Sequence, residues 1–248
     1  MTKIQWEAFT DFRDRFRHQC KLWSKTAETP SSWLSSLQKN AATNDKTPEY
    51  PIETPVVYNR SLESITEEDD IKLILTGDNP GKNEQLTKNQ QYLVGLSGKL
   101  ADGFFKKNPD LSIDFRSNVI ILNKSPIHTA KTKQLSYLLR HGGDSFNSLF
   151  EETQKWMAIE TVKLQKELSC PHWIVGYGEL KEKGLFSVYA TELSKQYEYN
   201  TEELVYLFQH FSMNRFSIDL AQQSITGYSL KETLIRLGLT HRKNILHW

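Results

Sequence analysis

The sequence predicts an α/β protein: a three-layer α/β/α sandwich with a central, mainly parallel four-stranded sheet and an N-terminal helical extension. Two observations lead to this fold class. Four short apolar runs alternate with stretches of helical periodicity, an order typical of parallel sheets between helix layers. The runs are apolar at successive positions, as in strands that helices cover on both faces. We expect one domain, made of an N-terminal helical extension and linker, residues 1–55, and an α/β part, residues 56–248.

The N-terminal part begins with an amphipathic helix over residues 4–25. Apolar residues recur there at helical spacing, with charged residues on the remaining faces. These positions are Trp6, Phe9, Phe12 or Arg13, Phe16, Cys20 and Trp23. We interpret this stripe as a packing face. Residues 40–55 contain Pro48, Pro51 and Pro55, which disfavour a helix and predict an extended connector at the boundary.

The four predicted strands are the apolar runs 71–75, 119–122, 173–175 and 204–208. Between the second and the third, apolar residues from Phe146 to Leu168 repeat at helical spacing. Asp144 or Ser145 is the expected N-cap of this helix, and Pro171 follows its end. The chain therefore contains a strand, helix, strand unit.

A further helix is predicted near the C-terminus. Ser229 and Glu232 have the spacing of a capping box, and Gly238 stands where we expect the helix C-cap. In open parallel sheets, ligands bind beyond the carboxyl ends of the strands. The loops that follow the four strands are therefore where we expect a functional site.

Composition narrows the classes of function. The chain has 31 Lys and Arg against 30 Asp and Glu, a net charge of +1, which excludes a globally basic nucleic-acid protein but leaves room for a local basic patch. No apolar run approaches the ~20 residues of a membrane span, and the N-terminus has no secretory-signal pattern, so we expect a cytoplasmic protein without a membrane partner. Two cysteines cannot form a disulfide framework or an iron-sulfur site, and the histidines lack paired ligand spacing. We therefore expect no metal and no cofactor.

Polar residues follow three of the four predicted strands. The first strand leads into Gly77-Asp78-Asn79-Pro80-Gly81, the second into Asn123, and the fourth into His210-Phe211-Ser212-Met213-Asn214-Arg215. Taken singly, the first segment is an ordinary turn, Asn123 a loop-capping amide and His210 a structural histidine. Because the three segments follow strands of one parallel sheet, we expect them to meet at one ligand.

These segments resemble motifs of the uracil-DNA glycosylase superfamily. Residues 77–81 look like the G-x-N-P-G loop of its mismatch-specific and single-strand-selective branches, and residues 91–100 like the P-F-V-G-x-[SA]-G-x-L segment of its iron-sulfur branch. Residues 119–123 are similar to the L-L-L-N strand of the best-known uracil branch, and residues 210–215 to the H-P-S-P-R-N loop of the single-strand-selective branch. The matched order covers roughly residues 70 to 220.

The resemblance implies three sets of site residues. The catalytic set is Asn79, Asp78 and His210. The base-binding set is Tyr92, Asn123, Gly77, Pro80 and Gly81. The DNA-binding set is Ser212, Met213, Asn214, Arg215 and Lys124. Whether Asp78 activates the attacking water or Asn79 positions it stays open, because a carboxylate and an amide can each do part of that work.

The expected function is hydrolysis of the N-glycosidic bond of uracil, or of a related deaminated or mispaired base, flipped out of single- or double-stranded DNA by a monomeric enzyme. Phe211 replaces the proline of the motif, and the motifs come from several branches. An alternative is therefore a catalytically weak or inactive DNA- or nucleotide-binding protein with the same fold. A third interpretation is an unrelated α/β protein whose turns imitate the motifs.

Overall fold

The computed structural model describes residues 1–29, 32–197, 204–223 and 227–248. Its centre is a four-stranded sheet in the order β2-β1-β3-β4, with all neighbouring strands parallel. The strands are β1 (Leu73–Gly77), β2 (Val119–Asn123), β3 (His172–Val175) and β4 (Val205–Phe208), and every residue in them is buried. The predicted parallel sheet, covered on both faces, is confirmed.

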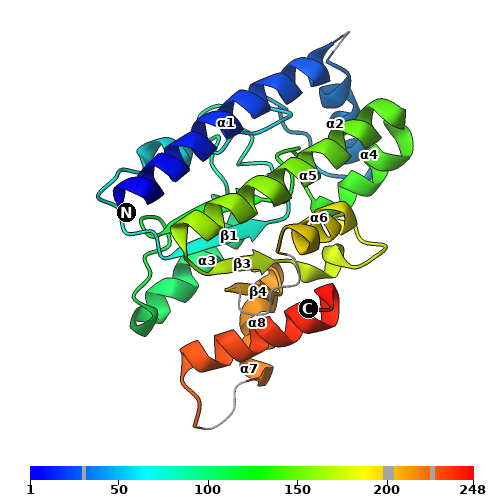
Figure 1. The fold of residues 1–248 in the computed structure, drawn as a ribbon. Helices are drawn as coiled ribbons and strands as arrows, with labels where there is room; N and C mark the ends of the chain where they lie inside the picture. Colours follow the sequence, from blue (N-terminus) through cyan, green and yellow to red (C-terminus); the bar gives the residue numbers. More distant parts are fainter. Residues whose placement is uncertain (30–31, 198–203, 224–226) are drawn as a thin grey trace.

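Helices form a layer on each side of this sheet (Figure 1). One layer contains α5 (Gly143–Leu168), α6 (Ser187–Tyr197) and, outside them, α1 (Lys3–Glu28). The other contains α3 (Leu96–Lys107), α7 (Arg215–Gln223) and α8 (Leu230–Leu246). Trp173 of β3 shows how the second layer packs, because its ring lies 5.7 Å from that of Phe105 in α3 and 6.1 Å from that of Phe216 in α7. The α/β/α sandwich is therefore observed as predicted.

The N-terminal helices share one core with the sheet. The aromatic stripe of α1 is buried, as predicted, and packs on Trp156 of α5, with ring centroids 5.5 Å apart for Phe16 and 5.6 Å for Trp23. The second helix, α2 (Trp33–Asn44), and the short helix α4 (Leu135–His141) lie at the same end of the molecule (Figure 1). Residue 55 therefore marks the end of a connector, and no break in the hydrophobic core falls there.

Two helix boundaries differ from the prediction. Helix α5 has Gly142 as its N-cap, two residues before Asp144 and three before Ser145, the expected caps; Asp144 lies in its first turn, where a negative charge is favourable. In α8 the Ser229–Glu232 capping box is confirmed, but Gly238 is not the C-cap, because the helix continues to Leu246. A Cβ atom on Gly238 would lie 2.5 Å from the Cβ of Tyr206, so this glycine lets α8 pack closely against β4.

Candidate active site

Residues that follow all four strands line a cavity of about 650 Å³ at the carboxyl edge of the sheet. Asp78 and Asn79 follow β1, Asn123 ends β2, Gly176 follows β3 and His210 follows β4. The register places Gly77 beside Asn123, so the first two loops leave the sheet side by side. The volume suits a small ligand or one extruded nucleotide base.

Asp78 is held by a buried ion pair with Lys124. The Lys124 Nζ atom lies 2.5 Å from Asp78 Oδ1 and donates a second hydrogen bond to the carbonyl of Val175 at 2.6 Å. The Lys124 side chain is fully buried, while that of Asp78 keeps 11% of its surface exposed to the cavity side. Burial lowers the pKa of Lys124, and the charge of Asp78 opposes that shift. The predicted contact of Lys124 with DNA is therefore wrong, because a buried amine presents no surface to a phosphate.

The amide of Asn79 has a defined orientation. Its Nδ2 atom donates to the Thr129 hydroxyl at 2.8 Å and to the Ile127 carbonyl at 3.1 Å. Its Oδ1 atom is buried and has no hydrogen-bond partner among the described residues. A buried acceptor without a partner costs about 1–3 kcal/mol, so this oxygen is suited to accept a hydrogen bond from a bound molecule.

Asn123 presents the complementary group. Its Nδ2 atom is buried and, within the described part of the chain, has no acceptor. Its Oδ1 atom occupies the space beside Gly77, where an added Cβ would lie only 2.7 Å away. Gly77 and Pro80 are buried and do not line the cavity. Gly81 does line it. Of the predicted base-binding residues, Asn123 and Gly81 thus face the ligand space.

His210 is a neutral donor. Its Nδ1 atom accepts a hydrogen bond from the backbone N–H of Ser212 at 3.0 Å, so Nε2 carries the ring proton of the neutral form. Burial lowers the pKa of His210; Asp78 opposes this shift, whereas Lys124 and Arg215 add to it. At neutral pH the imidazole therefore offers an Nε2–H group next to the cavity.

The loop after β4 forms one rim of the cavity. Phe211, which stands where the H-P-S-P-R-N motif has proline, is buried and stacks on Phe216 with ring centroids 4.4 Å apart. Met213 is 67% exposed, and both it and Asn214 adopt positive φ angles, 54° and 55°. Such backbone is strained by about 1–3 kcal/mol for residues with a side chain. Met213 and Arg215 line the cavity, whereas Asn214 is exposed outside it.

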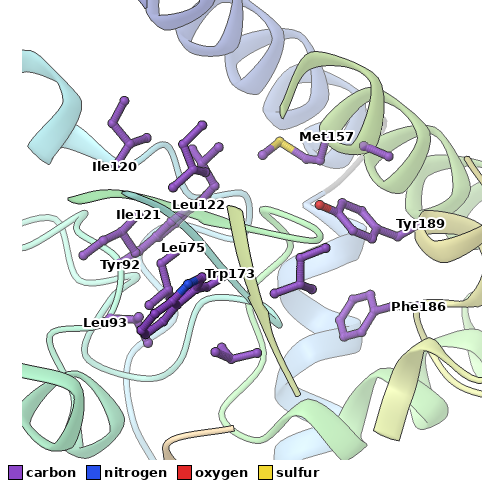
Figure 2. Packing of buried hydrophobic residues seen from close by; sticks show 14 of the residues in the cluster. Leu75, Tyr92, Leu93, Ile120, Ile121, Leu122, Met157, Trp173, Phe186 and Tyr189 are labelled. Atoms are coloured by element: carbon purple, nitrogen blue, oxygen red, sulfur yellow. The ribbon is translucent and has the colours of Figure 1, made fainter. Parts of the chain in front are cut away.

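Tyr92 does not line the cavity. Its side chain is fully buried among core residues such as Leu75 and Ile121 (Figure 2), and its hydroxyl donates to the Val57 carbonyl at 2.6 Å. The neighbouring Leu93 is the cavity residue from this segment. The prediction that Tyr92 stacks on a base is therefore wrong in this structure. Packing in the hydrophobic core and the hydrogen bond to Val57 both hold the ring away from the cavity.

Three further residues belong to the site in addition to the predicted ones. Glu84 lines the cavity and accepts a hydrogen bond from the Gly81 N–H at 3.1 Å, and burial raises its pKa to about 7. Thr129 orients Asn79, although nothing in its sequence context indicates this. Gly176, at φ 83°, follows β3 and lies against Asp78. The pair Gly176 and Gly178 indicates a further site loop in the sequence, since glycines after a strand let the backbone approach a ligand closely.

Comparisons with known proteins give no family for this chain. No protein-family model matches it, and no curated protein matches it. Across the described ranges, no helix has the length and apolar character needed to cross a membrane. Over the same residues, no group of three or more His, Cys, Asp or Glu side chains is arranged to hold a metal ion.

Proposed function

We propose that this protein is a DNA glycosylase that hydrolyses the N-glycosidic bond of uracil, or of a related deaminated or mispaired base, flipped out of DNA. One observation carries the proposal. Two residues that line the cavity beside the neutral His210 each carry a buried polar atom without a partner in the described chain, the acceptor Asn79 Oδ1 and the donor Asn123 Nδ2. Asn79 Oδ1 can accept a hydrogen bond from the attacking water, Asn123 can pair with the edge of the base, and His210 can donate to the leaving base. The motif resemblance of residues 77–81, 119–123 and 210–215 supports the same function.

Recognition of the base falls to Asn123. A carboxamide offers one donor and one acceptor side by side, which suits the O4 and N3–H edge of uracil and disfavours the inverted edge of cytosine. Extruding a base costs a few kcal/mol, which hydrogen bonds and packing in the pocket must offset. With Tyr92 in the core, Leu93 supplies an apolar wall but no aromatic stacking surface.

Bond cleavage places negative charge on the departing base and positive character on the sugar. The Nε2–H of His210 can donate to the base oxygen where this charge grows, and the Asp78 carboxylate can stabilise the cationic sugar. Water held by Asn79 Oδ1 then bonds to C1′ as the bond from C1′ to the base nitrogen breaks. Its proton passes to Asp78 or to solvent, and the base leaves as an anion that is protonated afterwards.

DNA contacts would come from the rim. Met213 is exposed and can fill the gap left by a flipped nucleotide, while Arg215, Lys131 and Lys133 also line the cavity and can approach phosphates. Lys131 and Lys133 both pair with Asp45, which reduces the positive charge that they present.

The second candidate is a DNA- or nucleotide-binding protein that performs little or no chemistry. It is favoured by the Asp78–Lys124 ion pair, in which the Lys124 ammonium already occupies one oxygen of the carboxylate, and by the absence of Tyr92 from the cavity lining. Both candidates place the same ligand in the same cavity, so only a test of turnover separates them.

The test uses single- and double-stranded oligonucleotides that contain one uracil, xanthine or hypoxanthine, followed by alkali to cut abasic sites. The glycosylase proposal predicts alkali-labile product with the wild type and its loss in Asn79→Ala. The matched control is Asn83→Ala, since Asn83 is exposed and does not line the cavity. DNA binding without abasic product would support the non-catalytic protein, and neither binding nor product would leave an unrelated α/β protein.

A further inference from the structure

The carbonyl oxygen of Pro80, in the turn that carries Asp78 and Asn79, receives two hydrogen bonds. The backbone N–H of Thr129 lies 3.1 Å from it, and Nδ1 of His128 lies 2.9 Å from it. A carbonyl can only accept, so Nδ1 of His128 carries a proton. Burial lowers the pKa of His128 to about 4, so the ring is neutral at neutral pH and its Nε2 atom is an acceptor.

The donor to that Nε2 atom is the hydroxyl of Tyr50, at 3.0 Å. Burial raises the pKa of Tyr50 to about 12, which keeps the phenol protonated. The two rings meet edge to face with centroids 5.6 Å apart, and the Lys82 ammonium lies 4.9 Å from the centre of the Tyr50 ring. The Tyr50 hydroxyl thus selects the tautomer of His128 that donates to Pro80.

The connector that contains Tyr50 is tied to the site at further points. The buried side chain of Gln85, four residues after Gly81, accepts hydrogen bonds from the backbone N–H groups of Glu53 at 2.7 Å and Thr54 at 3.1 Å. The Gln38 side chain of α2 donates to the His128 carbonyl at 2.8 Å. The connector is therefore part of the framework around the cavity.

Thr129 continues this chain of contacts to the reacting groups. Its hydroxyl donates to the Lys131 carbonyl at 3.1 Å, so its lone pair faces the Nδ2 group of Asn79, which donates to it at 2.8 Å. The direction of every hydrogen bond from Tyr50 to Asn79 is thereby defined.

We infer that Tyr50, through His128 and Thr129, is a positioning residue that holds the 78–80 turn and keeps the Asn79 carbonyl oxygen directed at the attacking water. The N-terminal part of the chain thereby supplies a component of the site. The effect on rate rests on the proposed glycosylase function, but the effect on the orientation of Asn79 does not.

The kinetic test compares Tyr50→Phe with Tyr228→Phe, a control at an exposed tyrosine outside the cavity lining. We expect Tyr50→Phe to lower kcat about tenfold with KM unchanged, because small displacements of a reacting group lower rate more than binding. Thr129→Val should behave like Tyr50→Phe, and Thr129→Ser, which keeps the hydroxyl, should restore the rate. A rise in KM with kcat unchanged would overturn the inference.

A second readout is independent of turnover. Hydrogen exchange of the Asn79 side-chain amide, followed by NMR and assigned by its loss in Asn79→Asp, should be slow in the wild type, Tyr228→Phe and Thr129→Ser. It should be about tenfold faster in Tyr50→Phe and Thr129→Val, since exchange follows local opening. Unchanged exchange in Tyr50→Phe would overturn the inference. If the wild type forms no abasic sites, the glycosylase proposal fails alone, and the exchange rates still decide whether Tyr50 positions Asn79.

Discussion

Removing both partners of the Asp78–Lys124 ion pair should destabilise the protein by clearly less than the sum of the two single removals. The Lys124 ammonium is fully buried, and among the described residues it donates hydrogen bonds to Asp78 at 2.5 Å and to the Val175 carbonyl at 2.6 Å. Loss of one member of a buried pair typically costs about 3–5 kcal/mol, because the other charge stays buried without compensation. Asp78→Asn should therefore cost close to the upper end of this range.

Lys124→Met should cost less than Asp78→Asn. The Asp78 side chain keeps 11% of its surface exposed beside the cavity, so water can solvate the carboxylate once the ammonium is gone. We expect about 3 kcal/mol. In the double variant both side chains are neutral, so its cost should be at least ~2 kcal/mol smaller than the sum of the two single variants.

Urea unfolding of the wild type and the three variants at one pH measures this coupling. Single-variant costs that add within ~0.5 kcal/mol would refute the argument that the pair is tightly coupled. The same variants decide between Asp78 and Asn79. If Asp78 takes the proton of the water, Asp78→Asn loses turnover, whereas if Asn79 positions the water without a base, the variant keeps most of the wild-type rate.

Three further predictions concern the surroundings of the cavity. Because burial raises the pKa of Glu84 from 4.5 to about 7, Glu84→Gln should be more stable than the wild type by up to about 3 kcal/mol above pH 7. The gain should shrink as the pH falls from 7 to 4.5 in thermal melts, and a gain independent of pH would contradict this origin. Asp45→Asn should free Lys131 and Lys133 from their ion pairs, so that anisotropy titrations show tighter DNA binding. The slope of the logarithm of the binding constant against the logarithm of salt concentration should be steeper by about 0.7–0.9 per freed lysine. An unchanged slope would mean that these lysines do not contact DNA. Gly176→Ala would place a side chain at a φ of 83°, with its Cβ only 2.6 Å from Asp78 Oδ1. It should lower the free energy of unfolding by about 1–3 kcal/mol or more. An unchanged melting temperature would show that the loop relaxes freely.

Much of the scaffold could be predicted from the sequence because its signals are local. Strands buried on both faces must be apolar throughout, so runs such as 119–122 are visible without a structure. The stripe of α1 and the Ser229 capping box depend on residues three or four positions apart. The prediction of Gly238 as a C-cap is wrong because it rests on a local pattern too. A glycine after apolar helical positions is typical of a helix end, and only the contact with β4 shows that this glycine allows close packing.

The pattern of apolar runs is enough to predict the sheet and to place Asp78, Asn79, Asn123 and His210 at one edge of it, since the carboxyl ends of parallel strands share that edge. What each side chain does at that edge depends on its three-dimensional neighbours. The fully buried Lys124 binds Asp78 and cannot reach DNA, while burial of Tyr92 leaves Leu93 at the cavity. Burial and hydrogen-bond partners arise from segments far apart in the chain, so no local pattern encodes them.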